Sequence, residues 1–400
     1  MDFALGKSLF EKIWVASPAS TKSSDGLGPL YNARSCVQCH IQNGKGSVPK
    51  ENDKAVSLIL KLGKRNGQSN QSGVQGDVIY GQQLQSFATV GHFAEYTLKT
   101  VDKTHQVQLS GGQAVTLHQP YYQINNLAYG ELEQDTYLSA RLAPALNLMD
   151  AMDGFSDAEI LSMADPHDDN QDGVSGRPHW IESGAGGNKR IGRFGHKAQI
   201  VSLIEQIQSA LAFDMGLSNV AFPKGYGDCS FKQIKCIKAP HGDDHKLGAP
   251  EVSKQMTTLI AAYLQGLTLP VRPARTQQEV TGRQIFEEIG CIACHGAHLV
   301  DTRSGRALYS DLLLHDMGRG LADSVQTFEA MGFEWRTAPL VGIGLTKIKN
   351  AKTGFLHDGR ARTILEAILW HGGEAQTARD KFIHATAAER KNLLQFVESL

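Results

Sequence analysis

Two pentapeptides of the pattern C-x-x-C-H stand far apart in this chain. Their residues are Cys36, Cys39, His40, Cys291, Cys294 and His295. Two thiols one helical turn apart can each bond one vinyl group of a haem, and the next residue then lies under the iron as its proximal ligand. Two zinc half-sites are the alternative, but zinc would require further Cys or His at short spacing. The pattern therefore predicts two covalently attached c-type haems.

The remaining cysteines, Cys229 and Cys236, are seven residues apart and do not supply a zinc pattern cleanly. Haem attachment of this kind takes place outside the cytoplasm, so we expect a periplasmic protein. In that compartment Cys229 and Cys236 are expected to form a disulfide, the alternative being two free buried thiols. The first fourteen residues lack the basic and then apolar stretches of a signal peptide. We therefore expect the export signal to have been removed or to be encoded elsewhere.

The sixth ligand of each iron decides between electron transfer and substrate chemistry. For the second haem the candidate is His371, because a helix predicted over 363–371 would end there, before two glycines. His315 and Met317 are rivals. For the first haem, residues 41–91 contain neither His nor Met. This iron is therefore expected to be open to peroxide or another small oxidant, or to be ligated from a remote segment by His92 or His196.

Oxygen-bearing side chains alternate in the segment 168–175. Asp168, Asn170 and Asp172 occupy the first, third and fifth positions of a calcium-loop pattern, a glycine follows, and Val174 stands seventh. The twelfth residue is His179 rather than the bidentate Glu of an EF-hand. The segment predicts a calcium loop that is not an EF-hand proper, and a solvated acidic turn is the alternative.

The elements that position these residues are repeated along the chain. The sequence GKSLFEKI at 6–13 reappears as GRQIFEEI at 282–289, and IAAYLQGL at 260–267 is matched by LLQFVESL at 393–400. Both pairs have apolar residues at helical spacing. A cytochrome c domain is built from a first helix, the haem motif, loops, and a last helix that crosses the first. We therefore predict two such domains, 1–268 and 276–400, joined by a linker containing Pro270 and Pro273.

The first domain is too long for a bare cytochrome c, and the excess lies at about 65–190. Within it, the runs 106–109 and 114–118 alternate with period two around Ser110-Gly111-Gly112, which predicts a hairpin. Further helices are predicted over 197–212, 253–267 and 387–399. The expected fold is mainly α, with two cytochrome c-like haem domains and a small insertion containing a β-hairpin in the first.

Composition excludes several classes of protein. Apolar residues make up 41% and charged residues 20%, which is ordinary for a soluble globular chain. The net charge of −1 gives no bulk attraction to nucleic acid or to an anionic membrane surface. No apolar run reaches the length of about eighteen residues that a membrane span requires. We expect no nucleic-acid partner and no membrane span.

Six further segments carry a family resemblance: 26–36, 125–130, 192–195, 311–318, 334–337 and 357–374. With them the chain resembles, over almost its whole length, the di-haem c-type oxidoreductases often labelled predicted thiol oxidoreductases or peroxidases. These are relatives of the bacterial di-haem cytochrome c peroxidase. The label of thiol oxidoreductase has no support here, because Cys229 and Cys236 lack the C-x-x-C arrangement. The resemblance implies that the C-terminal haem passes electrons and that the N-terminal haem meets peroxide.

The resemblance also bears on the second haem. In the peroxidases a His-x-Gly segment follows that haem, and the distal ligand, a Met, stands fourteen residues beyond its His. The relative that matures the cofactor of methylamine dehydrogenase uses a Tyr there. His357 aligns with that His, and fourteen residues on stands His371. This implies a bis-His second haem of low potential, which departs from the Met pattern.

For the first haem, the peroxidases carry a Gln and a Glu-Met pair over the iron, after a Leu-x-x-Gln helix. Gln206 and Asp214-Met215 look similar, with two residues fewer between them and Asp in place of Glu. The implied roles are an acid that shuttles a peroxide proton and an amide that positions the oxygen. An ordinary helix C-terminus is the alternative. The peroxidases also hold calcium between their domains, which supports a cation here but not the 168–174 loop in particular.

These observations predict a periplasmic, peroxidase-like di-haem oxidoreductase. Substrate chemistry is expected at the first haem and electron transfer at the second. A small electron-donor protein, either a c-type cytochrome or a blue copper protein, is the expected partner. The alternatives are a pure electron-transfer di-haem cytochrome and an oxidase that modifies a side chain of another protein.

Overall fold

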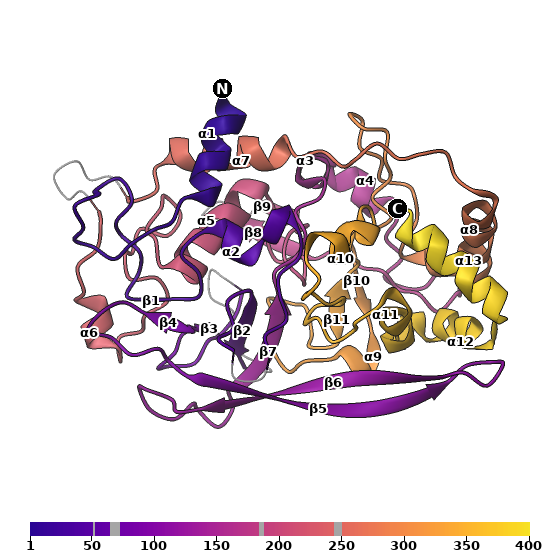
Figure 1. Ribbon diagram of the computed structural model, residues 1–400, viewed down its shortest axis with the longest axis horizontal. Helices are drawn as coiled ribbons and strands as arrows, with labels where there is room; N and C mark the ends of the chain where they lie inside the picture. Colours follow the sequence, from indigo (N-terminus) through magenta and orange to yellow (C-terminus); the bar gives the residue numbers. More distant parts are fainter. Residues whose placement is uncertain (51–52, 65–72, 184–187, 244–249) are drawn as a thin grey trace.

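The computed structural model describes residues 1–50, 53–64, 73–183, 188–243 and 250–400 (Figure 1). The helices are α1 (Asp2–Glu11), α2 (Cys36–Cys39), α3 (Met149–Gly154), α4 (Asp157–Leu161), α5 (Leu203–Met215), α6 (Ile234–Ile237), α7 (Lys254–Gln265), α8 (Gln277–Ile289), α9 (Gly318–Leu321), α10 (Thr346–Lys349), α11 (Ile364–Trp370), α12 (Gln376–His384) and α13 (Ala387–Glu398). The strands are β1 (Leu30–Tyr31), β2 (Leu58–Gly63), β3 (Gln83–Leu84), β4 (Phe87–Ala88), β5 (Thr97–Gln108), β6 (Ala114–Asn125), β7 (Tyr137–Leu142), β8 (Trp180–Ser183), β9 (Asn188–Ile191), β10 (Leu314–Asp316) and β11 (Glu334–Arg336). Helices hold more residues than strands, but the described chain also has eleven strands, so the β content is larger than the small insertion expected from the sequence.

Capping residues determine where the longer helices begin. Thr276 before α8 and Thr386 before α13 each form a capping box with a Glu three residues on, which satisfies backbone N–H groups of the first turn. The helix predicted over 197–212 instead begins at Leu203, because the Ser202 hydroxyl accepts from the N–H of Glu205. Ala198 has φ 49, which is incompatible with a helix. The predicted start was therefore wrong by about one and a half turns.

The sequence repeat corresponds to two similar helix crossings. Helix α1 packs on α7, and α8 packs on α13. A Cβ on Gly6 would collide with the carbonyl oxygen of Leu259, and a Cβ on Gly282 with that of Asn392. Aromatic pairs continue each crossing: Phe10 and Tyr263 have ring centroids 5.2 Å apart, and Phe286 and Phe396 5.3 Å. The repeated glycine thus allows the same close approach of first and last helix in both halves.

The hairpin of β5 and β6 is longer than predicted and connects the two halves. Each strand has twelve residues, paired from Thr97 with Asn125 to Gln108 with Ala114. In Figure 1 it runs beneath both the N-terminal and the C-terminal elements. At its tip, the N–H of Ser110 donates to the Ile383 carbonyl at 3.0 Å, and Arg390 donates to the Ser110 carbonyl at 3.0 Å. The segment expected as part of the first domain therefore also packs on the second half.

Three buried clusters support the fold. The first joins α1, α5 and α7, and the second joins α8, α11 and α13 with Leu109 and Leu117 of the hairpin. The third lies on the antiparallel sheet β3-β2-β7 and receives Tyr122 and Ile124 from the hairpin base. The expected start of the insertion, residue 65, lies outside the described residues.

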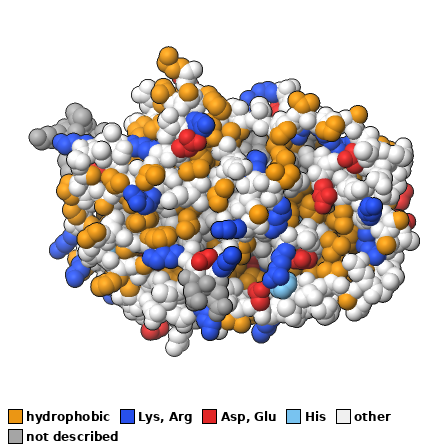
Figure 2. All heavy atoms as spheres, viewed as in Figure 1, with side chains coloured by type: hydrophobic (Ala, Val, Ile, Leu, Met, Phe, Trp, Pro, Cys, Tyr) orange, Lys and Arg blue, Asp and Glu red, His pale blue; other side chains and the backbone are white. Residues whose placement is uncertain are grey.

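Figure 2 shows one face, on which Lys and Arg side chains lie among acidic and apolar ones, in keeping with a net charge of −1. Within the described residues, no helix combines the length and apolar character that a bilayer span requires.

Candidate functional site

The second C-x-x-C-H motif directly follows α8 and faces a second histidine. The Nδ1 of His295 donates to the Tyr309 carbonyl at 2.9 Å. His371, at the C-cap of α11, donates from Nδ1 to the Ala367 carbonyl at 2.7 Å. Because a carbonyl only accepts, Nδ1 carries the proton in both rings and each Nε2 keeps its lone pair. A charge on His371 also lowers the pKa of His295, so the two rings lie near each other.

Both imidazoles are suited to bind a metal as neutral ligands. Burial is the main reason that the pKa of His295 falls to about 4, and burial also lowers the pKa of His371. A neutral imidazole with a fixed Nδ1–H and a free Nε2 is the form that ligates iron. Cys291 and Cys294 are free thiols, as attachment to a haem vinyl group requires. The donor set at this motif therefore fits a haem with His295 and His371 as axial ligands.

The rival His315 is held by acids on both sides. Its Nε2 lies 2.9 Å from Oδ2 of Asp311, and its Nδ1 lies 2.7 Å from Oε2 of Glu374. Burial opposes the charged form, but the hydrogen bonds to Asp311, Cys294 and Glu374 outweigh it and raise the pKa of His315 well above its usual value. An imidazolium has no lone pair for iron. Met317 packs against the second core beside α9.

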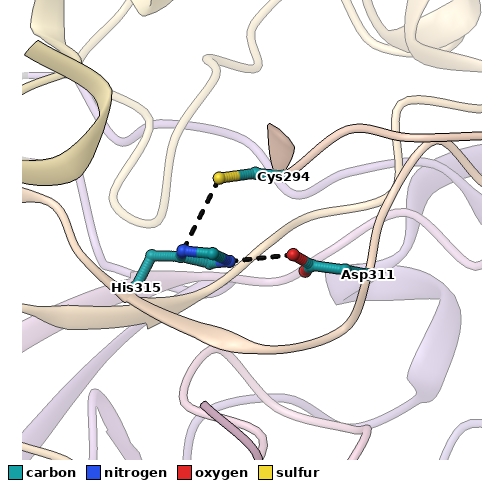
Figure 3. Close-up of side chains that lie close together, drawn as sticks. All are labelled: Cys294, Asp311 and His315. Atoms are coloured by element: carbon teal, nitrogen blue, oxygen red, sulfur yellow. Dashed lines mark hydrogen bonds and ion pairs between the residues drawn. The ribbon is translucent and has the colours of Figure 1, made fainter. Parts of the chain in front are cut away.

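Cys294, Asp311 and His315 form the one group in the described chain whose three His, Cys or carboxylate ligand atoms lie within 4.8 Å of one another. Figure 3 shows the His315 ring between the other two side chains. Cys294 Sγ is 3.6 Å from Nδ1, whereas Asp311 is bonded to Nε2. Both ring nitrogens of His315 are hydrogen-bonded to carboxylates, so we describe the group as a buried ionic network.

The first motif repeats the arrangement of the second. Cys36 and Cys39 bound helix α2 and are free thiols, and Nδ1 of His40 donates to the Pro144 carbonyl at 2.9 Å. Burial lowers the pKa of His40 to about 4. His40, His295 and His371 thus share a protonated Nδ1 and a free Nε2. This donor set also fits a haem, with His40 as the proximal ligand.

Asp214, at the C-terminal end of α5, lies beside the first motif. Its charge acts with burial to raise the pKa values of Cys36 and Cys39. The Nε2 of Gln83 donates to Oδ1 of Asp214 at 2.9 Å, and Lys61 donates to Oε1 of Gln83. Burial raises the pKa of Asp214, although Lys61 and Gln83 oppose the rise. The result is a carboxyl group able to exchange a proton above the usual pH range of Asp.

Gln206 does not stand next to Asp214. Both lie on α5, but eight residues of helix separate them by about 12 Å along its axis. The amide that contacts Asp214 comes from Gln83, in β3, which sequence reasoning missed. A signal for part of this network was present: Lys61 is the one charged residue in the apolar strand LILKLG.

The alternative ligands of the first haem lie in different places. His92 is partly buried; burial lowers its pKa, and Lys235 of α6 lowers it further. His196 lies among basic residues: burial, Arg141, His357 and other cations lower its pKa well below the usual value. His357 in turn stacks on Trp335, with ring centroids 3.9 Å apart and planes at 10°. His196 therefore belongs to a group of buried basic side chains.

The predicted calcium loop folds around its own side chains. Asp168 accepts from the N–H of Gly173 at 3.1 Å, Asn170 from that of Asp172 at 2.8 Å, and Asp172 from that of Val174 at 2.9 Å. Such turns arise in solvated acidic loops as well as in calcium loops. The loop joins the second half through Ser175, whose Oγ donates to Glu374 at 2.9 Å. Calcium binding by Asp168, Asn170, Asp172 and Val174 stays a prediction.

Cys229 and Cys236 form the expected disulfide, with Cα atoms 6.2 Å apart. The bond joins Cys236, which lies in α6, to Cys229, which precedes that helix. It leaves the four motif cysteines as the free thiols of the described chain.

Two C-x-x-C-H motifs placed alike against two helix crossings, each with a neutral, oriented histidine, define a protein of the di-haem class. A family described as "di-haem oxidoreductase, putative peroxidase" matches residues 103–400, and the chain belongs to this family. Among curated proteins it is similar to the hydrazine synthase subunit gamma of Kuenenia stuttgartiensis, with 26% identity over 178 residues that cover 35% of this chain. The match spans 48% of that relative, about half its length. No solved structure matches the chain.

Proposed function

We propose that this di-haem oxidoreductase is a peroxidase-like enzyme with covalently attached haems, with substrate chemistry at Cys36-Cys39-His40 and electron transfer at Cys291-Cys294-His295. The observation that carries the proposal is the unlike surroundings of the two motifs. The second has a second oriented imidazole, His371, near its proximal one. The first has the carboxyl group of Asp214 nearby instead.

Two cytochrome c-like units, 1–268 and 276–400, account best for the repeat. In each, a first and a last helix cross at a glycine, and the haem motif follows the first helix. The β5–β6 hairpin would then be an insertion that holds the units together. This layout supports a fixed distance between the haems, which electron transfer requires.

The proposed roles of the second site follow from its ligands. His295 and His371 would both hold the haem iron, so this site would transfer electrons rather than bind substrate. Imidazole stabilises ferric iron better than a thioether does, so a low potential is expected. A small c-type cytochrome or a blue copper protein would deliver single electrons to this site.

The proposed roles of the first site follow from Asp214. The haem would supply the electrons that cleave the oxygen–oxygen bond of peroxide. Reduction of one peroxide consumes two electrons and two protons and yields two waters. Asp214 can take a proton from one peroxide oxygen and deliver it to the other, because its raised pKa allows both forms. Gln83 holds the carboxyl in place, and Lys61 holds Gln83.

A location outside the cytoplasm is part of the proposal. The Cys229–Cys236 disulfide supports it, because such bonds persist in oxidising compartments. Covalent haem attachment through C-x-x-C-H has the same requirement. Calcium at the 168–174 loop is a further proposed component.

Peroxide turnover tests the function. The holoprotein is mixed with peroxide and a reduced small cytochrome or blue copper protein, and oxidation of the donor is followed by absorbance. Steady turnover, with a spectral change of one haem on adding peroxide, is the expected result. Absence of any spectral change in the resting and half-reduced protein would reject peroxide chemistry and leave an electron-transfer cytochrome.

A further inference from the structure

A group of basic side chains lies between the two haem motifs. We call it the basic cluster, and its members are Lys45, Arg141, His196, Arg336 and His357. Burial is the main reason that the pKa of His196 is lowered. It is lowered further by nearby basic side chains, namely Arg141, His357, Lys45 and Arg336. Burial lowers the pKa of His357, and Arg360, Arg141, Lys197 and Lys45 lower it further. Arg360 is paired with Asp358 at 2.9 Å and is not counted in the cluster. These five side chains therefore lie near one another in a poorly solvated region, where both imidazoles are held neutral.

Carboxylates act on the cations of this cluster from a distance, but within the described residues none of these cations makes a direct hydrogen bond to one. Arg141 is 6% exposed; its buried Nη2 makes no hydrogen bond within the described chain, and its nearest carboxylate, on Asp323, is 3.8 Å away. Arg336 donates to the carbonyls of Gly195 and Thr337, at 3.0 and 2.9 Å. Lys45 donates to the Leu356 carbonyl at 2.6 Å. These carbonyls accept hydrogen bonds but carry no charge.

Lys197 differs from these cations, although it is also buried nearby. Its ammonium donates to the carbonyls of Met331 and Glu334 at 2.7 and 2.8 Å and lies 3.8 Å from Asp323. It also lies over the Trp335 ring. A third carbonyl, that of Gly332, also accepts from this ammonium, so all three N–H donors are used and none is left for an anion. Lys197 is therefore left out of the cluster.

Several buried cations without matching anions are costly, because burial removes their hydration and repulsion adds to the loss. A bound anion removes that cost. The cluster's position indicates which anion. Lys45 follows His40 by five residues. At the other end, Arg336 is influenced by Asp311, whose N–H donates to the Cys294 carbonyl at 3.1 Å. The cluster therefore extends from one motif to the other.

We infer that the basic cluster binds the propionate carboxylates of the two haems, with Arg141 and Arg336 as the principal donors and Lys45 beside the first motif. Each haem has two propionates, which supply the missing negative charge inside the protein. Guanidinium groups suit this role, because they bind carboxylates in pairs of parallel hydrogen bonds and stay charged when buried. The inference rests on the proposed covalent attachment of both haems.

A consequence for redox chemistry follows. Ferrous haem carries one positive charge fewer than ferric haem, so a nearby cation favours the reduced state. The basic cluster should raise the potentials of both haems above the values they would have with unpaired propionates. It should partly offset the low potential expected for the bis-His haem.

The experiment uses the holoprotein and the variants Arg141→Gln, Arg336→Gln and Lys45→Gln. Covalent haem content is measured first, by haem staining of denatured protein. Midpoint potentials are then measured by spectroelectrochemistry, and propionate bending bands by resonance Raman spectroscopy. Each variant is expected to lower the potential of at least one haem and to shift its propionate bands. The control is Arg390→Gln: this buried arginine donates to the Ser110 carbonyl at the hairpin tip and to the Ala385 carbonyl at the end of α12, and its loss should leave potentials and bands unchanged.

The outcomes separate the inference from the proposed function. Wild-type protein without covalent haem would reject the attachment. Haem-loaded variants with wild-type potentials and propionate bands would overturn the basic cluster's role alone. Where an Arg→Gln variant does not fold, Arg141→Lys and Arg336→Lys replace it. They keep the charge but lose the paired hydrogen bonds, so the bands should shift while the potential changes little, and unshifted bands would count against the inference.

Discussion

The imidazoles of His295 and His371 lie close enough that a charge on one lowers the pKa of the other, and each directs its Nδ1–H to a backbone carbonyl. This relationship connects residues that are far apart in the chain. It places a second potential iron ligand at the second motif, while His315 is held between Asp311 and Glu374.

The substitution His371→Ala should convert one of the two haems to the high-spin state and leave the other unchanged, because it removes one axial nitrogen. Electron paramagnetic resonance of the oxidised protein measures this directly. Met317→Ala is the control and should keep the wild-type spectrum. A high-spin signal from Met317→Ala, with none from His371→Ala, would show that the second iron ligand is Met317 and not His371.

The substitution Asp214→Asn should reduce peroxide turnover by about 10²- to 10⁴-fold without changing haem content, because the amide cannot carry a proton. In the wild type, turnover should rise with pH as Asp214 loses its proton, at a pH above the usual range of Asp because burial raises its pKa. Pre-steady-state peroxide kinetics across pH are the measurement.

Gln83→Ala should lower peroxide turnover more than Gln206→Ala, since the Gln83 amide contacts Asp214 and Gln206 lies two turns away. The two variants remove the same chemical group from different places. Equal losses, or a larger loss for Gln206→Ala, would restore the interpretation drawn from the sequence.

The substitution Gly282→Ala should lower the free energy of unfolding by about 1–3 kcal/mol, because the added methyl group would collide with the Asn392 carbonyl at the crossing of α8 and α13. Gly154→Ala is the matched control: a Cβ there has no atom within 4 Å and φ is not positive, so little change is expected. Denaturant unfolding of both variants gives the comparison, and equal stabilities would contradict the close packing.

The substitution His315→Gln should destabilise the protein by about 3–5 kcal/mol at neutral pH, because Asp311 and Glu374 lose a buried cation. The pKa of His315 is raised in the folded state, so its contribution is full below the unfolded pKa of about 6.5 and declines as pH rises through the folded value. The stability difference between wild type and variant should therefore shrink at high pH. A difference that does not vary with pH would mean that His315 is uncharged.

The sequence alone determined those features that depend on residues close together in the chain. The C-x-x-C-H spacing indicated the haem motifs, the repeated glycine and aromatic residues indicated two helix crossings, and turn residues located the hairpin. Family membership followed from the resemblance and was confirmed by the match over 103–400. Each of these patterns lies within a few turns of chain, where local geometry is set by residue type and period.

The tertiary structure decided which distant side chains meet. Gln83 rather than Gln206 contacts Asp214. Gln206 and Asp214 lie eight residues apart on α5, whereas Gln83 is on strand β3, which packs beside the C-terminal end of that helix. Arg141 and Arg336 come together from different strands, and the hairpin reaches from the first half to α13. The physical reason is that the burial and the electrostatic surroundings of a side chain depend on how helices and strands pack. Packing brings together residues that are far apart in the chain, and no regular spacing in the sequence reveals such pairs.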